Sequence, residues 1–271
     1  MNFGLIIIGD EILSGKRQDK HLPKVLELLA ERGLALSWAR YVGDEPDRIT
    51  ADLQYALNSG DVVFSCGGIG ATPDDHTRQC AARALGVELA LHPVARDLIF
   101  ERMADTAVEQ GKPYEPDRAD NQHRLNMAVF PVGATIIPNP FNKIAGFSLP
   151  SLQAGEGGVY FVPGFPVMAW PMMAWVLDHR YPHLKRALST SEKSVIVFGA
   201  MEAALTPLME AIEANFNGVK VFSLPSVDHP QWGKHIELGV KGNAEFLASA
   251  FESLLHGLRE HGAELGPEMV R

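Results

Sequence analysis

Cysteine is scarce in this sequence: its 271 residues include two, Cys66 and Cys80. Two cysteines give neither a disulfide framework nor the ligand spacing of a structural zinc site. Ten histidines are present, but none stands in an HxH or HExxH spacing, so we interpret them as residues that bind no metal. Cys66 closes a predicted strand and is interpreted as a small buried hydrophobic residue rather than a reactive thiol.

Long hydrophobic runs and an excess of positive charge are lacking too. The apolar run 5–8 is short, has no basic flank and leads directly into Asp10 and Glu11, so we do not interpret it as a secretory signal. No other run approaches the length of a membrane span. The net charge of −9 argues against nucleic-acid or anionic-membrane partners, although local N–H groups and a metal still allow a phosphorylated small molecule. We expect a cytoplasmic protein.

The most informative stretch follows a predicted strand. The apolar run 62–64 leads into three glycines within four positions, Gly67, Gly68 and Gly70. Glycine lets a ligand approach the main chain, and backbone N–H groups ahead of a helix attract negative charge. A strand, a glycine-rich loop and a helix in this order predict a site for phosphate or pyrophosphate at the carboxyl end of the strand.

Signals for the start of a helix follow the glycines. Thr72 is predicted as the N-cap, Pro73 as the first helical residue and Asp75 as the acidic residue of a capping box. Asp74 and Asp75 would repel a phosphate held by the same loop. Either Asp75 only caps the helix, or a divalent cation bridges carboxylate and phosphate oxygens. Because there are two aspartates, both interpretations can hold at once.

Alternating strands and helices precede this stretch. We predict strands and helices, in chain order, at 3–8, 21–31, 34–42, 47–58 and 62–64. This β-α-β-α-β order indicates an α/β fold, a parallel sheet with helices on both faces. Asp10, Glu11 and Asp44 follow the first two strands, so we expect an acidic cluster beside the glycine loop, at the carboxyl edge of the sheet.

The remaining chain predicts more of this domain and then a second one. Further helices and short strands are predicted at 78–85, 92–107, 127–130, 135–137, 147–149, 159–162 and 167–177. The Pro-rich, charged stretch 111–121 is either a lid or an ordinary connector. A polar, basic segment near 181–191 marks a boundary, and we predict domains at 1–180 and 181–271. The second is a small α+β domain with β-α-β-β-α order.

The stretch 67–77, GGIGATPDDHT, resembles the GGxGxTxDDxT signature of CinA-like proteins, the competence/damage-inducible protein A family. Their N-terminal domain is similar to the molybdopterin-binding domain of MogA and gephyrin. Three further stretches agree in order: 9–15, 139–146 and 163–168. The resemblance implies a MogA-like, three-layer α-β-α fold with a mostly parallel sheet, and a small C-terminal domain.

The chain departs from the family's pattern at two places. It has Asp19-Lys20-His21 where Asp-Thr-Asn is frequent, and Val167 where a Glu often precedes the Met of the proline-glycine motif. Longer members carry an amidase domain that deamidates nicotinamide mononucleotide. Because this chain ends before such a domain, it resembles the short form.

The resemblance implies a nucleotide pyrophosphatase. Similar domains hydrolyse the pyrophosphate of ADP-ribose or FAD with a divalent metal (Mg²⁺, Mn²⁺ or Co²⁺) and accessory K⁺. On that reading Asp75 and Asp74 are catalytic, Asp75 and Asp10 hold the metal, and Lys143 neutralises the diphosphate. The full set of expected ligand-binding residues is Gly67, Gly68, Gly70, Thr72, Thr77, Asp10, Glu11, Asp44, Asn139, Lys143, Gly146 and Gly164.

Two alternatives remain open at this point. The same cradle would hold the phosphate of molybdopterin, with or without adenylyl transfer, and the family's aspartate then corresponds to Asp75. Alternatively, the domain is a non-catalytic nucleotide-binding module, an alternative that the departures at 19–21 and Val167 keep open. Relatives associate through this domain, so we also expect a homo-oligomer, most simply a dimer.

Overall fold

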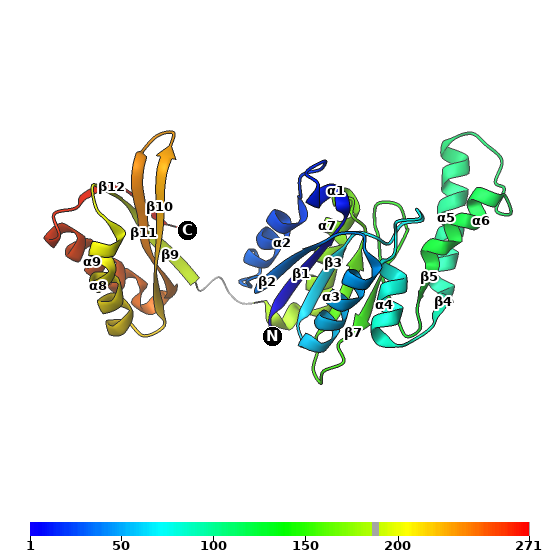
Figure 1. Ribbon diagram of the computed structural model, residues 1–271, viewed down its shortest axis with the longest axis horizontal. Coiled ribbons are helices and arrows are strands. Elements are labelled where there is room, and N and C mark those ends of the chain that lie inside the picture. The colour runs from blue at the N-terminus through cyan, green and yellow to red at the C-terminus, as the bar shows by residue number, and fades with distance from the viewer. Residues whose placement is uncertain (186–189, 271) are drawn as a thin grey trace. The chain divides into compact units, whose positions relative to one another are not determined.

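The computed structural model describes residues 1–185 and 190–270. By its internal contacts the chain divides into two compact units, Met1–Lys185 and Arg186–Arg271 (Figure 1). The predicted boundary after residue 180 coincides with the end of helix α7 (Pro166–Arg180), a few residues ahead of the division between the units.

A six-stranded sheet forms the centre of the first unit. Its strand order is β2-β1-β3-β8-β7-β6. The first four are parallel, and β7 runs antiparallel to both of its neighbours. The strands are β1 (Phe3–Ile8), β2 (Trp38–Val42), β3 (Val62–Cys66), β6 (Thr135–Ile137), β7 (Gly146–Pro150) and β8 (Gly158–Val162). β1, β3 and β8 are buried throughout, as continuous apolar runs in a doubly covered sheet require.

Helices cover both faces of this sheet, which confirms the predicted three-layer architecture. On one face α3 (Pro46–Ser59) and α4 (Thr77–Leu85) pack against Ile6, Ile8 and Val63. On the other, α2 (His21–Ala30) and α7 pack against the alternate residues Leu5 and Ile7. Because successive side chains of a strand point to opposite faces, one β1 sequence serves both cores.

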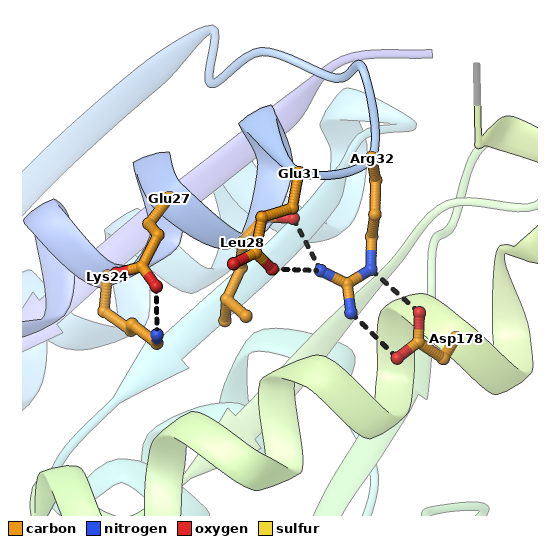
Figure 2. Close-up of polar contacts among 6 residues, drawn as sticks. All are labelled: Lys24, Glu27, Leu28, Glu31, Arg32 and Asp178. Atoms are coloured by element: carbon orange, nitrogen blue, oxygen red, sulfur yellow. Dashed lines mark hydrogen bonds and ion pairs between the residues drawn. The ribbon is translucent and has the colours of Figure 1, made fainter. Parts of the chain in front are cut away.

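An ion pair ties α2 to α7 on the second face. Arg32, which follows α2, donates two hydrogen bonds of 2.8 Å, one to each carboxylate oxygen of Asp178 (Figure 2). Its third nitrogen donates to the Leu28 carbonyl at 2.7 Å. This bidentate geometry fixes the Arg32 side chain, whereas the Lys24–Glu27 pair in Figure 2 stays within α2.

The segment between α4 and β6 forms an arm beside the main sheet (Figure 1). It contains β4 (Leu89–Leu91), α5 (Pro93–Glu109), α6 (Ala119–Arg124), the 3₁₀ helix η1 (Leu125–Ala128) and β5 (Val129–Pro131). β4 and β5 form a two-stranded antiparallel sheet. The predicted loop 111–121 includes the first residues of α6, and the strand predicted at 127–130 begins only at Val129.

The second unit is a four-stranded antiparallel sheet of order β10-β11-β9-β12 with two helices. Alternate strand residues such as Val195, Val197 and Leu238 pack with these helices in one core. Its elements are β9 (Thr190–Phe198), α8 (Glu202–Asn215), β10 (Val219–His229), β11 (Gly233–Asn243), α9 (Ala244–Glu260) and β12 (Glu264–Val270). The predicted β-α-β-β-α order is present, and β12 adds a strand at the sheet edge.

The remaining short elements are α1 (Asp10–Leu13) and the 3₁₀ helix η2 (Pro182–Leu184). Among residues 1–185 and 190–270, no helix combines the length and apolar character needed to cross a lipid bilayer.

Candidate functional site

The carboxyl edge of the parallel strands opens into a cavity of about 690 Å³. Loops that follow β1, β2, β3, β6 and β8 all contribute to its wall. Nine of the catalytic and ligand-binding residues expected from the sequence line it: Glu11, Asp44, Gly67, Gly68, Gly70, Thr72, Asp74, Asp75 and Gly164. The fold therefore gathers side chains far apart in sequence at the edge where α/β proteins bind ligands.

The glycine loop presents backbone donors to this cavity. The Gly67 N–H continues the sheet and donates to the Val162 carbonyl at 3.1 Å. The next four N–H groups, from Gly68 to Ala71, have no hydrogen-bond acceptor within the described part of the chain, and all four residues line the cavity. Consecutive unpaired amides form a concave surface that favours an anion.

Two glycines of this loop have a backbone conformation that other residues resist. Gly67 has φ of 106°, and a Cβ there would lie 2.4 Å from the Ile8 carbonyl oxygen. Gly68 has φ of 67°, and its Cβ would lie 2.2 Å from the Thr77 hydroxyl. The protein's own packing therefore requires glycine at both positions.

The helix after the loop begins later than the sequence predicts. α4 begins at Thr77 with His76 as its N-cap residue, so the assignment of Thr72, Pro73 and Asp75 to its first turn is wrong. Thr72 and Asp75 do pair, but in a turn ahead of the helix: the Asp75 carboxylate accepts from the Thr72 N–H at 2.8 Å and from its hydroxyl at 2.5 Å.

Thr77 explains why the helix starts where it does. Its N–H donates to the Gly68 carbonyl at 3.0 Å, and its hydroxyl donates to the Gly67 carbonyl at 3.1 Å. These bonds close residues 68–77 into a loop before the helical pattern can begin. Thr77 is fully buried and does not line the cavity, so the structure places it as a support of the loop.

Carboxylates form a second wall of the site. Asp10 and Asp44 are joined reciprocally, since the Asp10 N–H donates to the Asp44 carboxylate at 2.9 Å and the Asp44 N–H donates to the Asp10 carboxylate at 3.2 Å. Partial burial, and then the charges of Asp10, Glu11 and Asp74, raise the pKa of Asp44. The raised pKa therefore reports mainly the partial burial of Asp44, to which the neighbouring negative charges add.

The predicted metal ligands are not arranged as a closed metal centre. Among the described residues, no three His, Cys, Asp or Glu side chains are placed to hold one ion. Asp10 does not line the cavity, while Glu11, Asp44, Asp74 and Asp75 do. Hard carboxylate oxygens suit Mg²⁺, which proteins often bind through one or two carboxylates together with substrate phosphates. The donor set fits a metal that arrives with a phosphorylated ligand.

The predicted second ligand loop is largely occupied with its own bonds. Asn139 is buried, accepts from the Phe141 N–H at 3.0 Å and donates to the Ile144 carbonyl at 2.9 Å. Lys143 pairs with Asp105 of α5 at 2.8 Å and lines no part of the cavity. Gly146 lies in β7, where a Cβ would be 2.3 Å from the Phe161 carbonyl oxygen.

Lys16 and Arg17 supply the cavity's positive charge, and sequence reasoning missed both. They follow the short helix α1, and the Arg17 N–H donates to the Glu11 carbonyl at 2.9 Å, which turns the chain back toward the sheet edge. The sequence feature that could have identified them is the pair of basic residues in the loop after the first strand. Asn142 and Phe165, from the loops after β6 and β8, also line the wall.

The two departures from the family's motifs have different surroundings. His21 is buried, its Nε2 donates to the Gly164 carbonyl at 3.0 Å, and burial lowers its pKa. Asp19 caps the same helix by accepting from the His21 N–H at 2.8 Å. Val167, by contrast, is exposed at the start of α7.

Residues 4–186 match the family model described as "Probable molybdopterin binding domain". Since the match covers more than half of the chain, this protein belongs to the molybdopterin-binding-domain family. The resemblance to CinA-like proteins is confirmed by a CinA-like protein of Anaeromyxobacter dehalogenans, which is 32% identical over 180 residues. That alignment covers 66% of this chain and 41% of the relative, so the chain spans well under half of that protein.

Two further relatives cover the chain differently. A protein of Caldivirga maquilingensis is 30% identical over 246 residues, and the alignment covers 89% of this chain and 88% of that protein. The crystal structure of a CinA protein of unknown function from Thermoplasma acidophilum is 24% identical, with a TM-score of 0.55. It covers 66% of this chain and 99% of its own, and it supports the fold of the first unit.

Proposed function

We propose that the 690 Å³ cavity binds a phosphorylated small molecule, with a phosphate group at the amides of residues 68–71. The observation that carries this proposal is the run of four unpaired N–H groups in one concave loop, within the described chain. Lys16 and Arg17 line the same cavity and add positive charge. Such amides need no side-chain rearrangement to bind an oxyanion, because the loop already holds them in place.

We further propose that the ligand is a nucleotide pyrophosphate such as ADP-ribose or FAD, and that the protein hydrolyses it with a divalent metal. The supporting observation is that Glu11, Asp44, Asp74 and Asp75 line the cavity that holds the anion-binding amides. Carboxylates beside a phosphate are unfavourable unless a cation lies between them. Mg²⁺, Mn²⁺ or Co²⁺, with K⁺ as accessory, fits that position.

The residues then have separate roles. The amides of Gly68 to Ala71 bind and orient the diphosphate, and Arg17 offsets its charge. Asp75, held in place by Thr72, and a neighbouring carboxylate would hold the metal. A divalent ion supplies charge neutralisation and lowers the pKa of an attacking water. Water adds to one phosphorus, the bridging P–O bond breaks, and the products are two phosphate monoesters.

A second candidate function is favoured by the family match. The family is described as a probable molybdopterin-binding domain, and the match includes the whole glycine loop. In this case the amides of 68–71 hold the phosphate of the pterin, with or without adenylyl transfer. A third candidate is a nucleotide-binding module without turnover, which retains the same amides and uses the carboxylates only to select metal-bound ligands.

One experiment separates the leading candidate from the others. The pure protein is incubated with ADP-ribose or FAD, with Mg²⁺, Mn²⁺ or Co²⁺ and K⁺, and AMP is measured by chromatography. Asp75→Asn is the matched variant, because an amide oxygen still accepts from Thr72 while the charge is lost. AMP from the native protein, and a loss of at least ~100-fold in a folded Asp75→Asn, support hydrolysis. No AMP from any combination overturns it.

The alternatives give distinct results in the same material. Molybdopterin binding predicts tight binding of the pterin without AMP from either dinucleotide. A non-catalytic module predicts a rise in Tm with ADP-ribose or FAD and no product, since a ligand that binds only the folded state stabilises it.

A further inference from the structure

A second cavity lies beside the loop that follows the glycines. It has a volume of about 380 Å³ and shares Ala71, Thr72 and Asp75 with the main cavity. The rest of its wall comes from other residues of that loop, from α4 and from the arm, and includes Arg78, His123 and Asn126. Of its lining residues, the functions proposed above use only Ala71, Thr72 and Asp75, which also line the main cavity.

Arg78 is the unusual group in its wall. Its side chain is buried, with 4% of the residue exposed, yet no carboxylate forms an ion pair with it within the described chain. One guanidinium nitrogen, Nη1, donates to the Ile69 carbonyl. Asp75 acts on Arg78 only through space, and burial lowers the pKa of the guanidinium. A buried charge without a paired counter-charge is costly, so a partner is expected.

The spare donors of Arg78 are not sealed from solvent. In the described chain none of its nitrogens is both sealed from solvent and without a hydrogen-bond partner. The nitrogens that bond no protein atom are therefore accessible to solvent. Arg78 lines the second cavity and none of the other four cavities described in this part of the chain. A planar guanidinium with free N–H groups matches a phosphate oxyanion in bidentate geometry.

Hydrogen bonds hold the part of the wall that the arm contributes. His123 donates from Nε2 to the Ala71 carbonyl at 3.1 Å, which leaves Nδ1 to accept from the Asn126 amide at 3.3 Å. These bonds attach the arm to the glycine loop and hold Asn126 at the cavity surface. The site is therefore enclosed by two segments that are distant in sequence.

We propose that this cavity is a second anion site, in which the Arg78 guanidinium binds a phosphate-class oxyanion, either free phosphate or a phosphate monoester. The site is separate from the phosphate position at 68–71, and the proposal does not rest on the function proposed above.

The test measures binding of inorganic phosphate by calorimetry in a Lys16→Glu background. Lys16 lines the main cavity and not the second one, so reversing its charge weakens phosphate binding in the main cavity. Asn126 lines the second cavity and not the main one. Adding Asn126→Asp places a carboxylate in the wall of the cavity that Arg78 lines, and we expect phosphate affinity to fall about tenfold or more. Asn126→Ala is the neutral control and should change affinity about threefold or less.

Two results would overturn the proposal. A Lys16→Glu protein that binds no phosphate at millimolar concentration overturns the proposal, as does phosphate binding that Asn126→Asp leaves unchanged. Circular dichroism establishes that each variant is folded. The pyrophosphatase assay can fail while this test succeeds, because the two experiments use different ligands and different cavities.

Discussion

Two loops at the carboxyl edge of the sheet use their polar groups in opposite ways. The loop 67–76 follows β3 and leaves the N–H groups of residues 68–71 without an acceptor among the described residues. The loop 138–145 follows β6, and the side chains of Asn139 and Asn142 bond backbone groups of the same loop. Both loops contribute to the same cavity, but only the first offers it a row of free backbone donors.

The difference teaches how to separate a binding loop from a supporting one. An unpaired amide beside a cavity has a free energy to gain from a ligand, whereas a satisfied Asn holds the surface in position. The side chain that the sequence assigns to the ligand, Lys143, instead pairs with α5. The predictions below test this contrast, beginning with the change expected to have the largest effect.

Gly68→Ala should be the most damaging change to the glycine loop. The new Cβ would lie 2.2 Å from the Thr77 hydroxyl at a φ of 67°. We expect a loss of about 2–4 kcal/mol in the free energy of unfolding, measured by denaturant titration. Gly86→Ala is the matched control, since its φ of 71° is similar but nothing lies within 4 Å of a Cβ; it should cost about 1 kcal/mol. Equal losses at both positions would show that crowding at Thr77 contributes nothing.

Asn139→Ala should damage stability while sparing ligand affinity. The change removes the acceptor for the Phe141 N–H and the donor to the Ile144 carbonyl in a buried position. We expect a loss of about 1–3 kcal/mol in the free energy of unfolding. Affinity for ADP-ribose or phosphate, measured by calorimetry below the melting range, should stay within about threefold. A selective loss of affinity would return Asn139 to the ligand set.

Much of the fold follows from local patterns, and the exceptions are instructive. The boundaries of β1 and β6 agree with those predicted. The strand predicted at 34–42 begins only at Trp38, because Leu34 and Leu36 pack into the core without joining the sheet ladder. β12 contains Pro267 and two glutamates, so nothing in its own sequence marks the strand that pairing with β9 creates.

The site was predictable wherever a residue directly follows a strand. The glycine loop, Glu11 and Asp44 lie where the ends of parallel strands must meet. Lys16 and Arg17 were missed because a turn of α1 brings them back to the edge, and Lys143 was misplaced because its partners lie on α5. Contacts between segments far apart in sequence decided both cases.

Arg17→Ala should weaken ligand binding and leave stability nearly unchanged. Arg17 is exposed and lines the cavity, so its removal takes away positive charge without opening the core. We expect the affinity for ADP-ribose or phosphate to fall about tenfold at low salt and less at high salt. Arg96→Ala is the matched control, because Arg96 lies on α5, lines none of the cavities and pairs with its neighbour Asp97. If both variants weakened binding equally, the loss of affinity would follow from the change in net charge and not from the position of Arg17 in the cavity.

Asp44→Asn should raise the thermal stability at neutral pH. Burial and neighbouring carboxylates raise the pKa of Asp44 above its ordinary value, so the folded state loses stability as pH rises through that raised pKa. Removing the charge should increase Tm by about 1–3 °C at pH 7, and the gain should vanish as pH falls toward 4.

Asp74→Asn provides the opposite sign in the same cavity. Hydrogen bonding from Thr72 and from its own backbone lowers the pKa of Asp74, so its stabilisation is present at neutral pH and is lost as pH falls through the lowered pKa. The changes in Tm of the two variants, measured from pH 3 to pH 8, should therefore differ in sign at neutral pH and both shrink as pH falls below 4. Parallel curves would contradict the opposite pKa shifts of the two carboxylates.

Lys143→Ala should have the smallest effect and is the sharpest test of the contrast between the loops. The Lys143 ammonium is solvent-exposed and pairs with Asp105 and Glu101, and exposed ion pairs contribute little to stability. Since it lines no part of the cavity, affinity for ADP-ribose or phosphate should change less than about twofold, against about tenfold for Arg17→Ala. If Lys143→Ala weakened binding as much as Arg17→Ala, the ammonium would have to leave α5 when the ligand binds, and the loop 138–145 would be a binding loop after all.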